Sequence, residues 1–82
     1  MIKVLFFARY REALELDELT LELSPAYSTL ADLQQFLINQ GGKWEVLNDE
    51  GLMCAINQEL VSPQSAIVDG DEVAFFPTVT GG

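Results

Sequence analysis

The 82 residues of the chain are enough for one small domain and too few for two. Thirteen acidic residues and four basic ones give the chain a net charge of −9. This charge disfavours nucleic acid and anionic membranes as partners. It fits either a role in solubility alone or electrostatic steering toward a basic partner. The hydrophobic fraction of 49% predicts a folded core, and no apolar run approaches the ~20 residues of a membrane span.

The first predicted element is a strand, IKVLFFA, at residues 2–8. Aromatic and β-branched residues dominate this segment, as is typical of strands. Side chains alternate between the two faces of a strand, and Lys3 should lie on the solvent side. Because Leu5 and Phe7 share that side, we expect both to be exposed apolar residues.

A second strand is predicted at residues 18–24, after a short helical turn within residues 8–17. Its leucines alternate with polar residues, which indicates one buried face and one wetted face. We expect this strand to form an antiparallel hairpin with the first. The leucines predicted to face the core are Leu19, Leu21 and Leu23.

The main helix is predicted to begin at Ser28 or Thr29, after a proline has ended the strand. Asp32 stands three residues after Thr29, at the position of a capping-box partner. Apolar residues then recur at helical spacing until Gly41-Gly42 ends the helix. The residues expected to pack in the core are Leu30, Leu33, Phe36 and Leu37.

The second half of the sequence predicts a short helix and then further strands. Trp44 and Leu47 should pack inward from the helix, at residues 43–48. The strands are expected at residues 52–57, near residues 59–61 and at residues 72–77, the last of them after a DGDE turn.

The last strand, EVAFFP, separates buried from exposed aromatic residues. It follows Gly70, which supplies the positive φ of the turn. With Val73 and Phe75 facing the core, Phe76 lies on the opposite face. Pro77 has no N–H to donate to a ladder, so strand pairing should end there.

This order of elements predicts an α+β fold of the ubiquitin-like β-grasp type. We expect a mixed sheet of four to five strands, with the main helix across one face and short additional helices. Residues 1–77 would form the domain, and residues 78–82 a flexible C-terminal Gly-Gly tail.

The residue types present argue against catalysis by this chain alone. The sequence has no histidine, and its glycines form no phosphate-binding loop. Cys54 is the only cysteine and stands in an apolar run, so we expect a buried, inert thiol. Asp69 and Asp71 lack the further ligands of a calcium loop. We therefore expect no bound metal or cofactor. The N-terminal stretch does not have the pattern of a signal peptide, and we expect a cytoplasmic protein.

The C-terminal tail is the segment of the sequence that could take part in a reaction. The five residues after Pro77 can reach about 17 Å at ~3.3–3.6 Å per residue. Gly81 and Gly82 have no side chain, so an activating enzyme could approach their backbone closely. A carboxylate accepts nucleophiles poorly until it is activated, for example as an acyl-adenylate. The pattern favours a tethered acyl carrier whose partner supplies the activation, although a frayed end without function would also fit.

Several motifs together carry a resemblance that covers essentially the whole chain. They are the IKVLFFA opening, Arg11 in the following short helix, the capped helix, Trp44, AINQELV, DGDEVAFFP and VTGG. The specific signature is DGDEVAFFP followed by a final Gly-Gly. On these motifs the chain resembles the small sulfur-carrier subunits of molybdopterin synthase, which are ubiquitin-like β-grasp proteins.

The resemblance implies a reaction cycle centred on Gly82. An adenylyltransferase of the ubiquitin-activating type would use ATP and magnesium to adenylate the Gly82 carboxylate, and a sulfur donor would convert it to a thiocarboxylate. The loaded tail would then enter a large catalytic subunit, in a heterotetramer of two small and two large subunits. There it would give sulfur to cyclic pyranopterin monophosphate, forming the dithiolene of molybdopterin. The chain is thus expected to be a sulfur-donating subunit, with the active site on the large subunit.

The resemblance also implies roles for individual residues. Gly82 would be the sulfur-bearing terminus and Gly81 its obligatory small neighbour. Phe76 and Leu60 match apolar positions that contact partners in the family. The other expected interface residues are Phe7, Arg11, Pro77, Thr78, Val79 and Thr80.

Two alternatives stay open. A sulfur carrier for thiamine synthesis or tRNA thiolation would share the fold and the Gly-Gly tail, although the helix and the Trp-containing segment before LMCAIN favour the molybdopterin type. An acidic module that binds partners without covalent chemistry, and whose tail is inert, is the alternative from another class.

Overall fold

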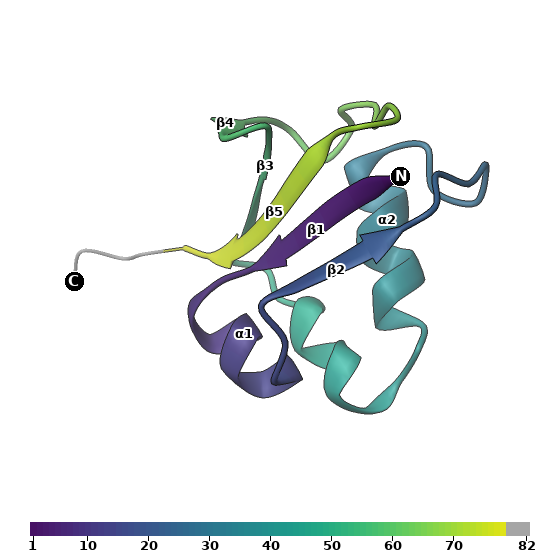
Figure 1. The fold of residues 1–82 in the computed structure, drawn as a ribbon. Helices are drawn as coiled ribbons and strands as arrows, with labels where there is room; N and C mark the ends of the chain where they lie inside the picture. Colours follow the sequence, from purple (N-terminus) through teal and green to yellow (C-terminus); the bar gives the residue numbers. More distant parts are fainter. Residues whose placement is uncertain (79–82) are drawn as a thin grey trace.

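The computed structural model describes residues 1–78, which form a five-stranded mixed sheet with helices on one face (Figure 1). The strands are β1 (Ile2–Phe6), β2 (Glu18–Leu21), β3 (Leu52–Ile56), β4 (Glu59–Leu60) and β5 (Glu72–Pro77). The helices are α1 (Ala8–Leu14), α2 (Leu30–Ile38) and the 3-10 helix η1 (Gly42–Leu47). This confirms the predicted α+β architecture.

The sheet has the strand order β2-β1-β5-β3-β4. β1 and β5 are parallel neighbours at its centre, whereas the pairs β1–β2, β3–β5 and β3–β4 are antiparallel. Parallel neighbours need a crossover connection, and the long chain segment between β1 and β5 supplies it. That segment includes α2, which lies behind the sheet in Figure 1.

The core lies between the sheet and the helices. Burial alternates along β1 as predicted, with Ile2, Val4 and Phe6 at most 1% exposed. Phe6 stacks on Phe75 with ring centroids 6.3 Å apart, and the ring of Trp44 meets Phe6 edge-on at 5.9 Å. Each large apolar side chain buried here stabilises the fold by about 1.5–3 kcal/mol. The helices contribute Tyr10, Leu14, Leu30, Leu33, Leu37 and Leu47 to this core.

The start of α2 follows its predicted capping chemistry. Thr29 is the N-cap in an extended conformation, and its Oγ1 accepts a 3.2 Å hydrogen bond from the N–H of Asp32. The regular helix ends at Ile38, before the predicted Gly41-Gly42 stop. The N–H of Gly41 donates to the carbonyl of Ile38 at 3.0 Å, and Gly41 has a φ of 75°, so the glycines form the turn beyond the helix.

Two residues predicted to lie in the core are exposed instead. Leu23 is 41% exposed because β2 ends at Leu21 and the alternation does not continue beyond it. Phe36 is 40% exposed because it stands about 100° around the helix from Leu37, at the rim of the buried stripe. Its ring packs beside Tyr27 with centroids 4.9 Å apart.

The helices of the described residues are short. None of them has the length and apolar character needed to cross a membrane.

Candidate functional site

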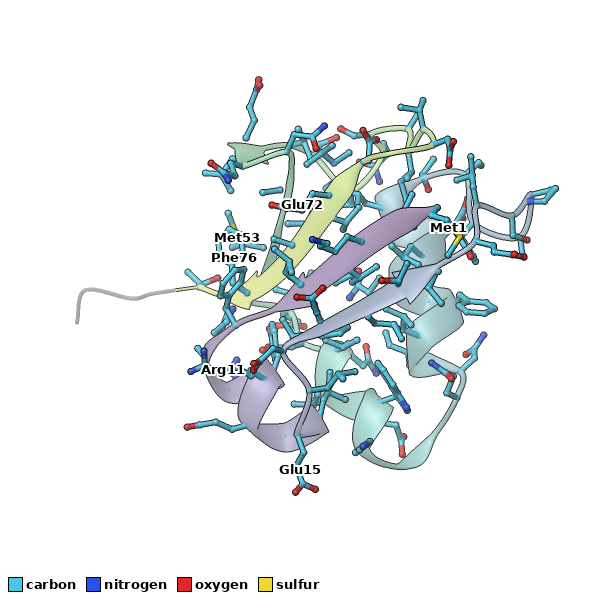
Figure 2. The ribbon with its side chains drawn as sticks, in the orientation of Figure 1. Met1, Arg11, Glu15, Met53, Glu72 and Phe76 are labelled. Carbon is cyan, nitrogen blue, oxygen red and sulfur yellow. The ribbon has the colours of Figure 1, made fainter. Side chains whose placement is uncertain are left out.

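The face of the sheet opposite the helices carries rows of side chains defined by the strand register. Residues directly opposite each other on neighbouring strands point to the same face. The middle row is Leu5, Ala74, Ala55 and Leu60, running from β1 across β5 and β3 to β4. Met53 and Phe76 form a second row, side by side at the end of β5 (Figure 2). Lys3 and Glu72 form a polar row at the other end.

A hollow in this face brings together three of the predicted interface residues. Phe7, Leu60 and Phe76 line it, with Phe7 43% and Leu60 62% exposed and Phe76 half-buried. We call it the open-face groove; its remaining lining residues are Leu5, Ala55, Gln58, Glu72 and Ala74. Large apolar side chains gathered on one exposed face are typical of interaction surfaces, and the role of Phe7, Leu60 and Phe76 in an interface stays a prediction.

The turn between β1 and α1 places Phe7 at the groove. The N–H of Phe7 donates to the carbonyl of Phe75 at 3.2 Å, which extends the pairing of β1 with β5 by one residue. Ala8 then adopts a left-handed φ of 52°, a conformation that is strained for a residue with a Cβ. The chain thus bends into α1 directly after Phe7, and the ring of Phe7 lies on the open face of the sheet, where it lines the groove.

Arg11 and Pro77 do not line the groove. Arg11 is exposed on α1, with its Nε 3.9 Å from the carboxylate of Asp17 (Figure 2). Such an exposed pair contributes little stability, so the guanidinium is available to a partner. Pro77 is buried opposite Leu52 at the end of β5. A role for either residue in an interface stays a prediction.

The residue after Pro77, at the base of the tail, is bonded to the loop that precedes β3. The N–H of Thr78 donates to the carbonyl of Gly51 at 2.8 Å, and the Thr78 hydroxyl donates to the same oxygen. The prediction that strand pairing ends at Pro77 is confirmed, because β5 and its last pair, Leu52 with Pro77, end there, and the Thr78 bonds lie outside the strand ladder. The predicted site residues Val79, Thr80, Gly81 and Gly82 lie outside the described residues.

One polar cluster was not predicted from the sequence. Asp49 accepts a 2.7 Å hydrogen bond from the Tyr10 hydroxyl and pairs with the Arg9 guanidinium, which lies over the Tyr10 ring. The hydrogen bonds from Tyr10 and Arg9 lower the pKa of Asp49 to about 2. Burial, followed by the bond to Asp49, raises the pKa of Tyr10 to about 12. Asp49 is therefore a carboxylate and Tyr10 a neutral donor at any physiological pH.

Comparison with known proteins identifies the family. The ThiS family matches residues 4–82. The chain belongs to the ThiS family. The molybdopterin synthase sulfur carrier subunit of Escherichia coli (strain K12) is 46% identical over 83 residues, a match that covers all of both chains. The predicted resemblance is thereby confirmed.

Solved structures related to this ThiS-family chain have the same fold. A putative molybdopterin converting factor subunit 1 from Pyrococcus furiosus is 28% identical with a TM-score of 0.76, covering 95% of this chain and 97% of that one. The complex of subunits 1 and 2 of the molybdopterin-converting factor from Helicobacter pylori 26695 includes a chain that is 23% identical, with a TM-score of 0.66. That match covers 99% of this chain and 97% of the other, and it supports the β-grasp fold.

Other reactive groups of this ThiS-family chain have structural partners. Cys54 is 4% exposed, and its thiol lies 3.6 Å from the carbonyl oxygen of Val61. Burial raises the pKa of this thiol. The prediction that the thiol is buried is confirmed. Asp69 pairs with the N-terminal ammonium, and Asp71 accepts a 2.9 Å hydrogen bond from the N–H of Val68. Within residues 1–78, no group of three or more cysteine, aspartate or glutamate side chains is placed to hold a metal ion.

Proposed function

We propose that this chain is the sulfur-carrier subunit of a molybdopterin synthase. The observation that carries the proposal is the 46% identity to the sulfur carrier subunit of Escherichia coli over the full length of both chains. The open-face groove supports it, because a carrier must dock on the proteins that load and unload it. The hydrogen bond from Thr78 to Gly51, in the loop before β3, supports it as well, because it gives the tail a defined starting point.

The chemistry of the proposal takes place at the carboxylate of Gly82. A carboxylate oxygen attacks the α-phosphorus of ATP on a partner adenylyltransferase, with magnesium bound to the nucleotide, and pyrophosphate leaves. A donor that supplies sulfur at the oxidation level of hydrosulfide then attacks the acyl carbon, the C–S bond forms as the C–O bond to AMP breaks, and a thiocarboxylate remains after loss of a proton. Gly81 and Gly82 suit this reaction because a side chain beside the reacting carbon would obstruct the enzyme. We place the reaction in the cytoplasm, where ATP is available.

Delivery of the sulfur needs a second partner, the large catalytic subunit. We propose that this subunit docks on the open-face groove through Phe7, Leu60 and Phe76, in an assembly of two small and two large subunits. The complex of subunits 1 and 2 of the molybdopterin-converting factor from Helicobacter pylori supports a partner subunit of this kind. The net charge of −9 favours a partner whose docking surface is basic.

Mass spectrometry of the loaded chain tests the proposal. Incubation with the adenylyltransferase, ATP, magnesium and a sulfur donor should add the mass difference between one sulfur and one oxygen atom. The same chain without Gly82, and the full chain without ATP, are matched controls that should stay unchanged. An unchanged full chain, beside an established carrier that is converted in the same mixture, would contradict the proposal.

A further inference from the structure

The loop between η1 and β3 contacts the base of the tail through one carbonyl oxygen. The oxygen of Gly51 accepts the N–H of Thr78 at 2.8 Å and also accepts its hydroxyl. This contact lies just beyond the last strand pair, Leu52 with Pro77. Because two donors of one residue reach the same acceptor, both the position and the orientation of the backbone at Thr78 are fixed. We call the Gly51–Thr78 contact the tail clamp.

The glycine at position 51 is explained by this contact. Gly41, Gly42 and Gly70 have positive φ angles, but Gly51 is not among the positive-φ glycines, so its backbone conformation does not demand glycine. A Cβ at position 51 would lie 3.2 Å from Oγ1 of Thr78, closer than ordinary van der Waals contact. The absence of a side chain at Gly51 therefore leaves room for Thr78.

Asp49 ties the clamp to the body of the domain. Its Oδ1 accepts a 3.1 Å hydrogen bond from the N–H of Gly51, and its Oδ2 accepts the hydroxyl of Tyr10 and pairs with Arg9. Tyr10 belongs to α1 and is fully buried, so its hydroxyl is a rigid donor. One carboxylate thus connects α1 to the loop that holds the tail.

We propose that Gly51 and Thr78, held by Asp49, are positioning residues for the reaction at Gly82. This inference rests on the proposed function, since it concerns how the tail reaches the activating enzyme. The four residues after Thr78 span at most about 14 Å, at ~3.3–3.6 Å each, so the position of Thr78 limits the region that the carboxylate can reach. A base that is ordered before docking removes part of the entropy cost of inserting the tail into a partner.

The test compares KM and kcat for ATP-dependent activation of the full chain by the adenylyltransferase. Gly51→Ala crowds Thr78 and should raise KM for the chain about 5- to 30-fold, the effect of one or two kcal/mol, while kcat and the Tm stay close to wild type. Adding Thr78→Ala to Gly51→Ala removes the crowded hydroxyl and should recover part of the loss. Thr78→Ser keeps both donors and should behave as wild type. Thr20→Ala, a change on the distant strand β2, is the matched control for loss of an exposed threonine hydroxyl.

The possible results separate the clamp from the proposed function. A wild-type chain that is never activated overturns the proposed function, whereas normal activation of wild type with an unchanged KM for Gly51→Ala overturns the clamp. A raised KM accompanied by a proportionate fall in Tm would also overturn the clamp, because it assigns the effect to stability. Amide hydrogen exchange of Thr78 in the isolated chain gives an answer independent of activity. The clamp predicts protection that is lost in Gly51→Ala, and rapid exchange in wild type would contradict it.

Discussion

At the scale of single residues, two neighbouring phenylalanines at the end of β5 have opposite roles. Phe75 is fully buried and stacks on Phe6, whereas Phe76 is half-buried on the open face beside Met53. Because successive residues of a strand point to opposite faces, the same side-chain type serves the core at one position and the groove at the next. Substitution of the two residues should therefore separate stability from binding.

Phe76→Ala should weaken binding to the large subunit about tenfold or more while lowering the Tm by only a few degrees. An aromatic side chain in the middle of an interface commonly contributes 1–2 kcal/mol or more to binding, and each ~1.4 kcal/mol is tenfold in Kd. Phe75→Ala is the matched control and should lose about 3–5 kcal/mol of the free energy of unfolding by leaving a cavity in the core. Calorimetric Kd values together with thermal unfolding check both variants. A Phe76→Ala protein with a strongly lowered Tm and an unchanged Kd would show that the Phe76 ring serves the core and not the interface.

At the scale of elements, the capped start of α2 stabilises the fold from the side opposite the groove. The Oγ1 of Thr29 satisfies the N–H of Asp32, one of the donors that a helix leaves without a partner in its first turn. α2 then buries Leu30, Leu33 and Leu37 against the sheet. The cap should thus affect how firmly the helix is held and leave the docking surface unchanged.

Thr29→Ala should lower the free energy of unfolding by about 1 kcal/mol, within a range of about 0.5–2. Urea denaturation should show a lower midpoint with an unchanged m-value, because the surface exposed on unfolding stays the same. Thr29→Ser keeps an accepting oxygen and should retain most of the stability. The contradicting result is a Thr29→Ala protein as stable as wild type, or one whose KM for activation by the adenylyltransferase rises.

The elements that could be predicted from the sequence are those whose signals are local. Alternation identified β1 and β5, and the Thr29–Asp32 spacing identified the start of α2. The errors fall where a pattern continues past the end of its element, as at Leu23, or where a residue lies at the rim of a helical stripe, as at Phe36.

The residues of the candidate site also fall into those that local patterns predict and those that only the tertiary fold brings together. Phe7 and Phe76 were predicted to be exposed because strand periodicity alone places them on the open face. The pairing of Asp49 with Arg9, 40 residues away, and of Thr78 with Gly51, 27 residues away, follows from the tertiary fold and has no local signal. The parallel pairing of β1 with β5 is long-range as well, and strand patterns do not specify which strands become neighbours.

At the scale of the whole molecule, the fold brings the open-face groove and the base of the tail at Thr78 to one region. Phe76 faces the open-face groove, and two residues later Thr78 is held by Gly51. A partner seated on the groove would therefore meet the tail at a fixed position. The chain is strongly acidic, with a net charge of −9, which favours a partner whose docking surface is basic.

In the proposed function, this chain gives the sulfur carried on Gly82 to the precursor of molybdopterin. The most direct measurement mixes the preloaded chain with the large subunit and cyclic pyranopterin monophosphate in a single turnover, and follows the mass of the chain together with the pterin product. The chain should return to its carboxylate mass while the dithiolene forms, with two loaded chains consumed per pterin. A chain that keeps its sulfur in this mixture, but passes it to a thiamine precursor or to tRNA with the corresponding enzymes, would overturn the proposed function.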